Sequence, residues 1–504
     1  MRLGVDFGTT RTIVAVADRG NYPVVAFEDS SGDLHEYFPS VVALRGTSLL
    51  YGFEALAAAA SGAPTLRSVK RLLGAPEVAA DTPVEIGGAT FGLLTVLTGF
   101  LGALRSALGN ASTIAAEVGA ATECPSVVSV PAHAHGAQRF LTLEAFRRAG
   151  FDVTGLVNEP SAAGFEYTHR QGRTLNSGRN QVLVYDLGGG TFDASLVEVA
   201  GVRHDVIGSV GVNRLGGDDF DQVLAELALD AAGRPVLEEA ARQRLRDECR
   251  EAKERITPQA KRITLDVAGA PVTVAVEDFY AVAAGLVNAS LEAMAPLVGA
   301  LEDEVETIGG QVAGIYLVGG GSGLPLVPRL LRERFGRRVH RSPYPSASTA
   351  IGLAIAADPA SGFALTDRLW RGFGVFRERS GGRGVRLDQL VDRNTALPAH
   401  GELSVTRRYR AVHNVGWYRF VEYADLTPDG EPRGDLAPFA EVRFPFDPAL
   451  QGRYVLDAVP VQRWDHGPLV EESYRVDPHG IVSVRICDLD TGYSQVYGLG
   501  RGAE

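Results

Sequence analysis

Two stretches far apart in the chain repeat one pattern, and this repeat most constrains the fold. Residues 3–17 read L-G-V-D-F-G-T-T-R-T-I-V-A-V-A, and residues 183–199 read L-V-Y-D-L-G-G-G-T-F-D-A-S-L-V-E-V. Each is an apolar strand that ends in an acid, Asp6 or Asp186, followed by a Gly/Thr turn and a second alternating strand. Two such copies predict two similar α/β lobes, each presenting one turn to a shared cleft.

The turns after these acids are rich in glycine, with Gly8 in the first and Gly188, Gly189 and Gly190 in the second. A turn without β-carbons lets backbone N–H groups approach an anion closely, as phosphate-binding loops do. For either copy alone, a tight β-hairpin that needs only positive φ angles is an equal alternative. Because an acid stands at the same place in both copies, the repeat favours a phosphate site.

A third glycine loop follows the apolar strand predicted at 314–318. It reads G-G-G-S-G over 319–323, and Pro325 suits the first turn of the helix that comes next. Its glycines would bring backbone and a helix N-terminus near an anion or a ribose. None of the three loops continues as G-K-[ST], so a phosphate-binding lysine must come from elsewhere.

Composition bounds the class of protein. The 504 residues are 45% hydrophobic with a net charge of −12, which suits a multidomain globular chain and argues against nonspecific nucleic-acid or anionic-membrane binding. Three widely spaced cysteines fit reduced thiols. Apolar windows such as 281–301 are interrupted by Asn288 and Glu292, and no secretory signal is evident. We therefore expect a cytoplasmic protein.

Taken in order, these motifs resemble the nucleotide-binding domain of Hsp70 chaperones, within the actin-like ATPase superfamily. Sugar kinases and bacterial actins share that fold, but D-L-G-G-G-T-F-D together with N-E-P-S-A-A favours Hsp70. The matching segments are V-D-F-G-T-T (5–10), F-P-S-V-V-A-L (38–44), S-V-K-R-L-L-G (68–74), V-V-S-V-P-A (127–132), G-A-Q-R (136–139), N-E-P-S-A-A (158–163), D-L-G-G-G-T-F-D (186–193), L-G-G-D-D-F-D (215–221) and V-G-G-G-S-G-L-P (318–325).

The resemblance continues into the last third of the chain. Segments 390–398 and 476–492 resemble strands of the Hsp70 substrate-binding β-domain. The fold class it implies is α/β, a duplicated, ribonuclease H-like two-lobed ATPase domain followed by an all-β sandwich. The expected domains are a nucleotide-binding domain at 1–360 (lobe I about 1–180, lobe II about 181–360), a linker at 361–371 and a β-sandwich at 372–504. We expect no helical lid after Tyr493.

The resemblance also implies Mg-ATP hydrolysis and a role for each matched residue. Asp6 and Asp186 would hold Mg²⁺ through water, Lys70 would offset charge on the γ-phosphoryl group, and Glu159 would place the attacking water. Thr191 would complete the catalytic set, and Asp193 resembles a K⁺ ligand. The remaining implied nucleotide contacts are Gly8, Thr9, Thr10, Gly188, Gly189, Gly190, Gly216, Gly217, Lys253, Gly319, Gly320 and Gly321.

Taken singly, three of these residues have plainer readings. Lys70, beside Arg71, could be a solvated surface charge. Glu159, before a proline, could cap a helix, and Asp193 could serve a turn. Only the ordered set favours catalysis over these alternatives.

The base end of the site departs from the family pattern. Two family arginines sandwich the adenine, and the matching positions here are Glu254 and Gly323. A family glutamate near the ribose falls on Arg250, which could swing onto the base. Losing an arginine–ring contact removes about 0.5–2 kcal/mol. We therefore expect weaker nucleotide binding than in typical relatives, and a calorimetric Kd in the low nanomolar range would contradict it.

The positions that carry signals between domains are mixed. Pro131 and Arg139 match the family's interlobe switch, and Asp367 matches the acid of its linker. The linker reads F-A-L-T-D rather than a run of leucines, so less apolar surface is available for docking. A family arginine that docks J-domain cochaperones falls on Gly155, although Asn158 is kept. A J-domain cochaperone and a nucleotide exchange factor are implied partners, with J-domain coupling open.

The expected function is Mg-ATP-dependent binding and release of polypeptide segments by the β-domain. Without a lid, clients should leave faster than in lidded relatives. A general chaperone and a β-domain serving one dedicated partner fit the residues equally well. The main alternative is a slow or nonhydrolysing nucleotide-gated scaffold, and a small-molecule phosphotransferase ranks third.

Overall fold

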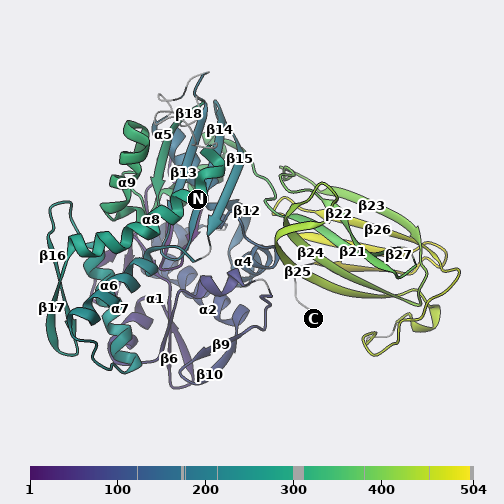
Figure 1. The fold of residues 1–504 in the computed structure, drawn as a ribbon, viewed down its shortest axis with the longest axis horizontal. Helices are drawn as coiled ribbons and strands as arrows, with labels where there is room; N and C mark the ends of the chain where they lie inside the picture. Colours follow the sequence, from purple (N-terminus) through teal and green to yellow (C-terminus); the bar gives the residue numbers. More distant parts are fainter. Residues whose placement is uncertain are drawn as a thin grey trace.

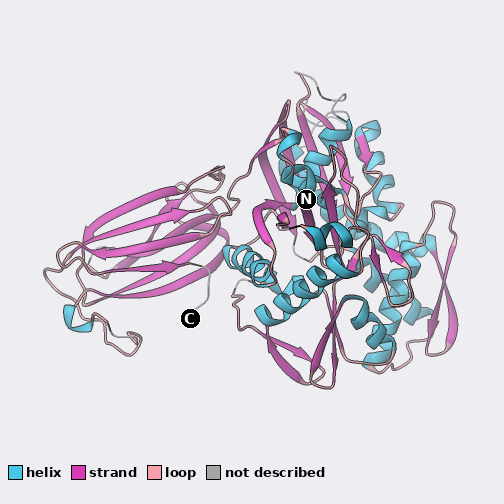
Figure 2. Ribbon diagram, turned by 180° about the vertical axis from the view of Figure 1, so that it is seen from behind, coloured by secondary structure: helices cyan, strands magenta, loops and turns pink. Residues whose placement is uncertain are grey.

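The computed structural model describes residues 1–75, 77–121, 123–171, 175, 178–212, 214–298, 311–379, 381–452 and 455–499. Most of the chain forms a large body of sheets covered by helices, and an elongated β-sandwich lies beside it (Figure 1). The view from behind shows that the helices belong to the large body, while the sandwich is built almost wholly of strands (Figure 2). The sheets of the large body define two lobes.

Lobe I is built on a five-stranded sheet in the order β12-β11-β1-β2-β5. Its centre is β1, which runs antiparallel to β2 and parallel to β11. The strands are β1 (Arg2–Phe7), β2 (Arg11–Ala17), β5 (Phe38–Pro39), β11 (Pro125–Val130) and β12 (Asp152–Asn158).

Lobe II repeats this topology in a sheet ordered β19-β18-β13-β14-β15-β20. Its centre is β13, antiparallel to β14 and parallel to β18, so β13 and β14 correspond to β1 and β2. The duplication expected from the two repeated stretches is therefore confirmed. The strands are β13 (Gln181–Leu187), β14 (Phe192–Ala200), β15 (Arg203–Val212), β18 (Val312–Val318), β19 (Val339–Arg341) and β20 (Ala364–Thr366).

Long helices fill the core of each lobe with one apolar face. In lobe I these are α2 (Leu93–Asn110) and α4 (Gly136–Arg148), and in lobe II they include α6 (Gly217–Ala231) and α8 (Val276–Val298). By length and composition α2 and α8 could each cross a membrane, but both also place buried side chains in a lobe core.

One helix overturns the expected boundary between the lobes. The division at about 181–360 assigns α10 (Ser348–Ala357) to lobe II, but α10 packs on β1, β2 and β11 of lobe I and on α5 (Glu159–Gln171). Glycines allow this contact, since a β-carbon on Gly4 would lie 2.2 Å from the Ala354 nitrogen and one on Gly352 1.8 Å from the Ala162 oxygen. The chain therefore returns to lobe I before it enters the β-domain.

The remaining helices and strands of the two lobes lie outside the two main sheets. They are β3 (Phe27–Glu28), β4 (Leu34–His35), β6 (Val41–Arg45), β7 (Ser48–Tyr51), α1 (Gly52–Ala60), β8 (Thr65–Arg67), η1 (Val69–Gly74), β9 (Pro83–Ile86), β10 (Ala89–Gly92), α3 (Ala115–Ala120), α7 (Glu239–Glu254), β16 (Arg262–Val267), β17 (Ala270–Ala275), η3 (Gly320–Gly323), α9 (Leu326–Phe335), η4 (Gly336–Arg338) and η5 (Pro359–Ser361).

The β-domain is a sandwich of two four-stranded sheets, β22-β21-β24-β25 and β23-β26-β27-β28. Aromatic side chains from both sheets fill the core. Its elements are β21 (Gly372–Arg379), β22 (Gly384–Val391), β23 (Leu403–Arg410), β24 (Val415–Leu426), β25 (Pro432–Pro445), η6 (Pro448–Leu450), β26 (Leu469–Val476), β27 (Val482–Asp488) and β28 (Ser494–Gly498).

The residues after Tyr493 can be compared with the expectation that no helical lid follows the sandwich. After Tyr493 the described chain forms β28, which pairs with β27. Residues 500–504, which that expectation also covers, lie outside the described residues.

A hydrogen-bond network around a buried carboxylate connects the two sheets of the sandwich. Glu472 is fully buried and takes two hydrogen bonds from Arg377, at 2.5 and 3.0 Å. The hydroxyls of Tyr409 and Tyr474 donate to it as well, each at 2.5 Å. Because every partner of the charge is supplied by the two sheets, this network joins them by a specific set of bonds.

The linker binds to both lobes before it reaches the sandwich. Its residues 364–366 form β20, which pairs in parallel with β15 of lobe II. Asp367 then accepts a 2.6 Å hydrogen bond from the Asn158 side chain, and Asn158 accepts one from Arg139 at 3.0 Å. Arg139 also donates to the backbone oxygen of His479 in the β-domain at 2.8 Å. Linker, lobe I and β-domain thus share one buried network.

A second contact joins the β-domain to the N-terminus of α4. The Glu422 carboxylate accepts from the backbone N–H of Gly136, at 3.0 and 3.1 Å to its two oxygens. The ring of Phe439 covers the same glycine, where a β-carbon would lie 2.1 Å from it. An acid at a helix N-terminus is favoured by the unpaired N–H groups and the helix dipole.

We expect Glu422→Gln to weaken this docking by about 1–2 kcal/mol, because the amide carries no charge for the helix terminus. Limited proteolysis at residues 361–371 should then be faster than in the wild type. Glu441→Gln is the matched control, since Glu441 lies exposed on the neighbouring strand β25. Equal cleavage rates for both variants would show that the Glu422 cap does not hold the domains together.

Low pH should also destabilise the folded protein by protonating the side chain of His133. Burial, and then the charge of Arg371, lower the pKa of His133 from 6.5 to about 4, with Arg393 and His135 adding to the effect. The stability that neutral His133 provides is complete above pH 6.5 and is lost as the pH falls toward 4. We expect a loss of about 2 kcal/mol between pH 7.5 and pH 5.

Thermal unfolding of wild type and His133→Gln at the two pH values measures this loss. Because acidification also changes the charge of other groups, the informative comparison is between the two proteins. The variant should lose less on acidification, and an identical drop in both would count against His133.

Candidate functional site

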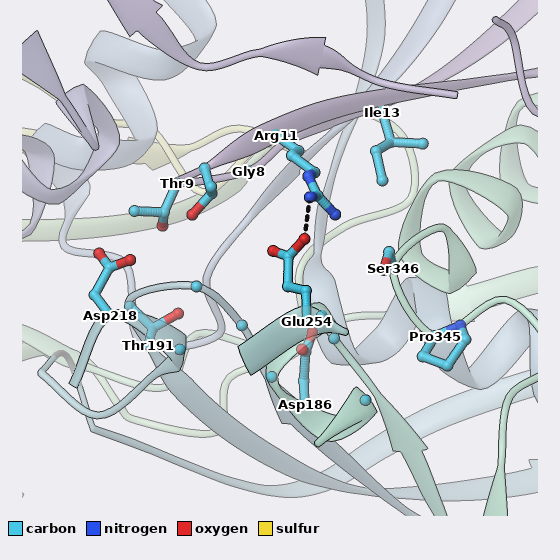
Figure 3. Close-up of a pocket in the computed structure, with 18 of the residues that line it drawn as sticks. Gly8, Thr9, Arg11, Ile13, Asp186, Thr191, Asp218, Glu254, Pro345 and Ser346 are labelled. Atoms are coloured by element: carbon cyan, nitrogen blue, oxygen red, sulfur yellow. Dashed lines mark hydrogen bonds and ion pairs between the residues drawn. The ribbon is translucent and has the colours of Figure 1, made fainter. Parts of the chain in front are cut away.

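A cavity of about 330 Å³ lies between the lobes and is lined by both. Figure 3 shows residues from the two hairpin turns and from later loops around it. Of the predicted site residues, those that line it are Asp6, Gly8, Thr9, Thr10, Lys70, Glu159, Asp186, Gly188, Gly189, Thr191, Gly217, Lys253, Gly319, Gly320 and Gly321.

The glycines of the two turns are explained by close approach. A β-carbon on Gly189 would lie 2.3 Å from the Thr10 hydroxyl oxygen, so the second turn lies directly against the first. Gly319 has a φ of +80°, and a β-carbon there would lie 2.3 Å from an Asp186 carboxylate oxygen. Both turns are therefore hairpins, and both line the cavity, where the phosphate interpretation stays a prediction.

One lysine that lines the cavity, Lys70, comes from η1. Lys70 donates to Glu159 at 2.5 Å, and both side chains are about nine-tenths buried. Burial opposes the charge of Lys70, but the charges of Glu159 and Asp6 outweigh it and raise the lysine pKa. Lys70 is thus no surface charge, and a buried charged pair at a cavity is typical of a functional site.

Three further carboxylates crowd the same place. Burial, and then the charge of Glu159, raise the pKa of Asp6 to about 6 and that of Asp193 to about 8, and they raise the Asp186 pKa well above its usual value. Four acids thus face one cation, Lys70. The surplus of oxygen donors fits a divalent cation such as Mg²⁺.

The donors suit a hydrated ion better than a fully protein-bound one. Among the described residues, no three acidic, histidine or cysteine side chains lie close enough together to hold a metal directly. Mg²⁺ commonly keeps several waters and meets only one or two carboxylates. Asp6 and Asp186, which line the cavity, are the residues placed for such contacts.

Three predicted residues lie beside the cavity rather than in its lining. Gly216 lies against Gly190, where a β-carbon would be 2.6 Å from the Gly190 nitrogen, so both serve the packing of loops. Asp193 is buried and accepts hydrogen bonds from the Thr191 hydroxyl and the Ala132 backbone. It thus places a further buried carboxyl group next to the residues that line the cavity.

A comparison with protein-family models agrees with this geometry. The model described as Hsp70 protein matches residues 2–407. The chain belongs to the Hsp70 family. It therefore has an actin-like ATPase domain followed by a β-sandwich, as expected. At the level of the family, this means nucleotide hydrolysis with Mg²⁺ and the binding of polypeptides and cochaperones.

In this Hsp70, the cations of α7 are already engaged. Arg250 pairs with Asp218 at 2.9 Å and with Asp221 at 3.3 Å, so it is held in place rather than free to swing onto a base. Lys253 pairs with Asp221 at 2.6 Å and donates to the Gly217 oxygen at 2.6 Å. Sequence reasoning missed these acids, although they stand in the quoted L-G-G-D-D-F-D segment.

Sequence reasoning also missed an ion pair that joins the two lobes across the cavity. Arg11, the first residue of β2, contacts Glu254, the last residue of α7, at 2.5 Å (Figure 3). The guanidinium also lies 4.6 Å from the centre of the Tyr37 ring. The only signal was a charge directly after the first turn, whose partner stands 243 residues away.

Breaking this ion pair should speed nucleotide release. Because the pair is partly exposed, we expect Glu254→Gln to lower the barrier to lobe opening by about 0.3–1 kcal/mol, a two- to fivefold faster dissociation. Stopped-flow release of a fluorescent ADP measures the rate. Glu251→Gln is the control, because Glu251 lies on the same helix and pairs with Arg255 at 3.8 Å. Unchanged release from Glu254→Gln would mean that the pair does not limit opening.

Proposed function

We propose that this chain is an Hsp70-type chaperone that binds and hydrolyses Mg-ATP to control the binding and release of polypeptide segments by its β-domain. The observation that carries the proposal is the buried Lys70–Glu159 pair. This pair lines the same cavity as Asp6 and Asp186, and these two acids lie near the turns of the two duplicated hairpins.

The residues around the cavity support hydrolysis by position and charge. Backbone N–H groups of the glycine turns and the hydroxyls of Thr9, Thr10 and Thr191 would hold the phosphates. Lys70 would offset charge that grows on the γ-phosphoryl group, and Glu159 would accept a hydrogen bond from the attacking water. When bound, Mg²⁺ would neutralise phosphate charge beside Asp6 and Asp186.

The order of residues along the chain supports control of the β-domain from this site. Glu159 begins α5, and the preceding residue, Asn158, bonds both Arg139 and Asp367. A shift of Glu159 on hydrolysis would therefore move the network that holds linker and β-domain. Two ligand-dependent positions of this network would constitute allosteric coupling.

A polypeptide ligand for the β-domain fits its architecture. Within the described residues β22 and β25 are the edges of one sheet, where an extended segment can add as a further strand. The three cysteines are buried and free, in keeping with a reducing, cytoplasmic setting.

Single-turnover hydrolysis of bound Mg-ATP by wild type and Lys70→Ala tests the proposal. We expect the variant to cleave ATP about 100- to 1,000-fold more slowly, since a preorganised charge at the reacting group is lost. Lys261→Ala removes an exposed lysine of lobe II and should behave as wild type. If wild type binds ATP and never cleaves it, the site is a nucleotide-operated gate for a partner of the β-domain.

A further inference from the structure

One arginine of the cavity forms no ion pair with any residue that the structure describes. Arg341, the last residue of β19, lines the cavity together with Gly323, Pro345 and Ser346. Across the part of the chain that the structure describes, no carboxylate lies within ion-pair distance of its guanidinium. An uncompensated cation beside a ligand cavity is available to the ligand.

The other four cations of the cavity differ from Arg341 in this respect. Lys70 is paired with Glu159. Arg11 is paired with Glu254, while Arg250 and Lys253 are both held by acids of α6. Their charges are satisfied before any ligand arrives.

The guanidinium of Arg341 lies against the backbone of Gly323. A β-carbon built on Gly323 would lie 3.5 Å from an Arg341 terminal nitrogen, an ordinary van der Waals distance. A side chain as small as alanine would therefore still fit beside the guanidinium. A longer side chain at this position would compete with it.

This arginine belongs to the end of the cavity away from the phosphate turns. In Figure 3, Ile13, Pro345 and Ser346 lie on the opposite side of the Arg11–Glu254 pair from Thr9 and Thr191. With phosphates in the turns, the rest of a nucleotide extends toward that end. Apolar side chains beside a free planar cation suit a flat aromatic base, because guanidinium groups stack well on π-systems.

We propose that Arg341 is the base-contacting, specificity-determining residue of the nucleotide site, and that its guanidinium stacks on the base over Gly323. This inference rests on the proposed binding of ATP in the same cavity. It assigns the base contact to β19, because Arg250 of α7 is held by Asp218 and Asp221.

Calorimetric titration of the full-length protein with Mg-ATP and with inorganic tripolyphosphate tests the assignment. Arg341→Ala should raise the Kd for ATP about three- to thirtyfold and leave that for tripolyphosphate within twofold. Arg341→Lys, which keeps the charge without the plane, should fall in between. Arg337→Ala, an exposed arginine of η4, is the control and should bind both ligands as wild type.

Two results would overturn the inference while the proposed function stands. In the first, Arg341→Ala weakens ATP and tripolyphosphate equally, so Arg341 is an anion contact. In the second, it changes neither. A wild type that binds no ATP would overturn both proposals. The unfolding temperature of each ligand-free variant separates a lost contact from a lost fold, and a variant that matches wild type in this respect but not in ATP affinity supports the assignment.

Discussion

The whole nucleotide domain depends on the close approach of two hairpin turns from different lobes. That approach is possible because Gly189 of lobe II has no β-carbon where it meets Thr10 of lobe I. Once the turns meet, Asp6 and Asp186 are brought to one cavity by the same register in two sheets. Any larger side chain at Gly189 would push the lobes apart and open the site.

The cost of this geometry is a concentration of negative charge. Burial, and then the charge of Glu159, raise the pKa values of Asp6, Asp186 and Asp193, and the charge of Lys70 offsets this only in part. At the other end of the cavity the charges are arranged differently. Arg11 and Glu254 join the lobes, and Arg341 forms no ion pair within the described part of the chain. The end of the cavity near Lys70 can therefore bind a cation, and the end near Arg341 can bind an electron-rich ligand.

Elements of lobe I that lie next to the cavity also make the contacts to the β-domain. Asn158 and Glu159 are consecutive, so the network that holds the linker and the pair that faces the cavity share a short piece of backbone. The Glu422 cap on α4 adds a second, charge-dependent contact near the first. Because both contacts are polar and specific, a small displacement in lobe I can weaken them without unfolding either domain.

The sequence alone determined the duplicated strand–acid–turn units and the two lobes, because strand alternation and glycine turns are local signals. The β-sandwich was implied by the resemblance to Hsp70. The sequence also indicated Lys70, Glu159, Asp6 and Asp186, which the fold brings together. Only the tertiary structure decided that α10 returns to lobe I and that Gly190 and Gly216 pack against each other. It alone placed Arg11 against Glu254 and Arg341 beside Gly323. These contacts join residues far apart in the chain. The periodicity of hydrophobic residues does not indicate which distant side chains will be in contact.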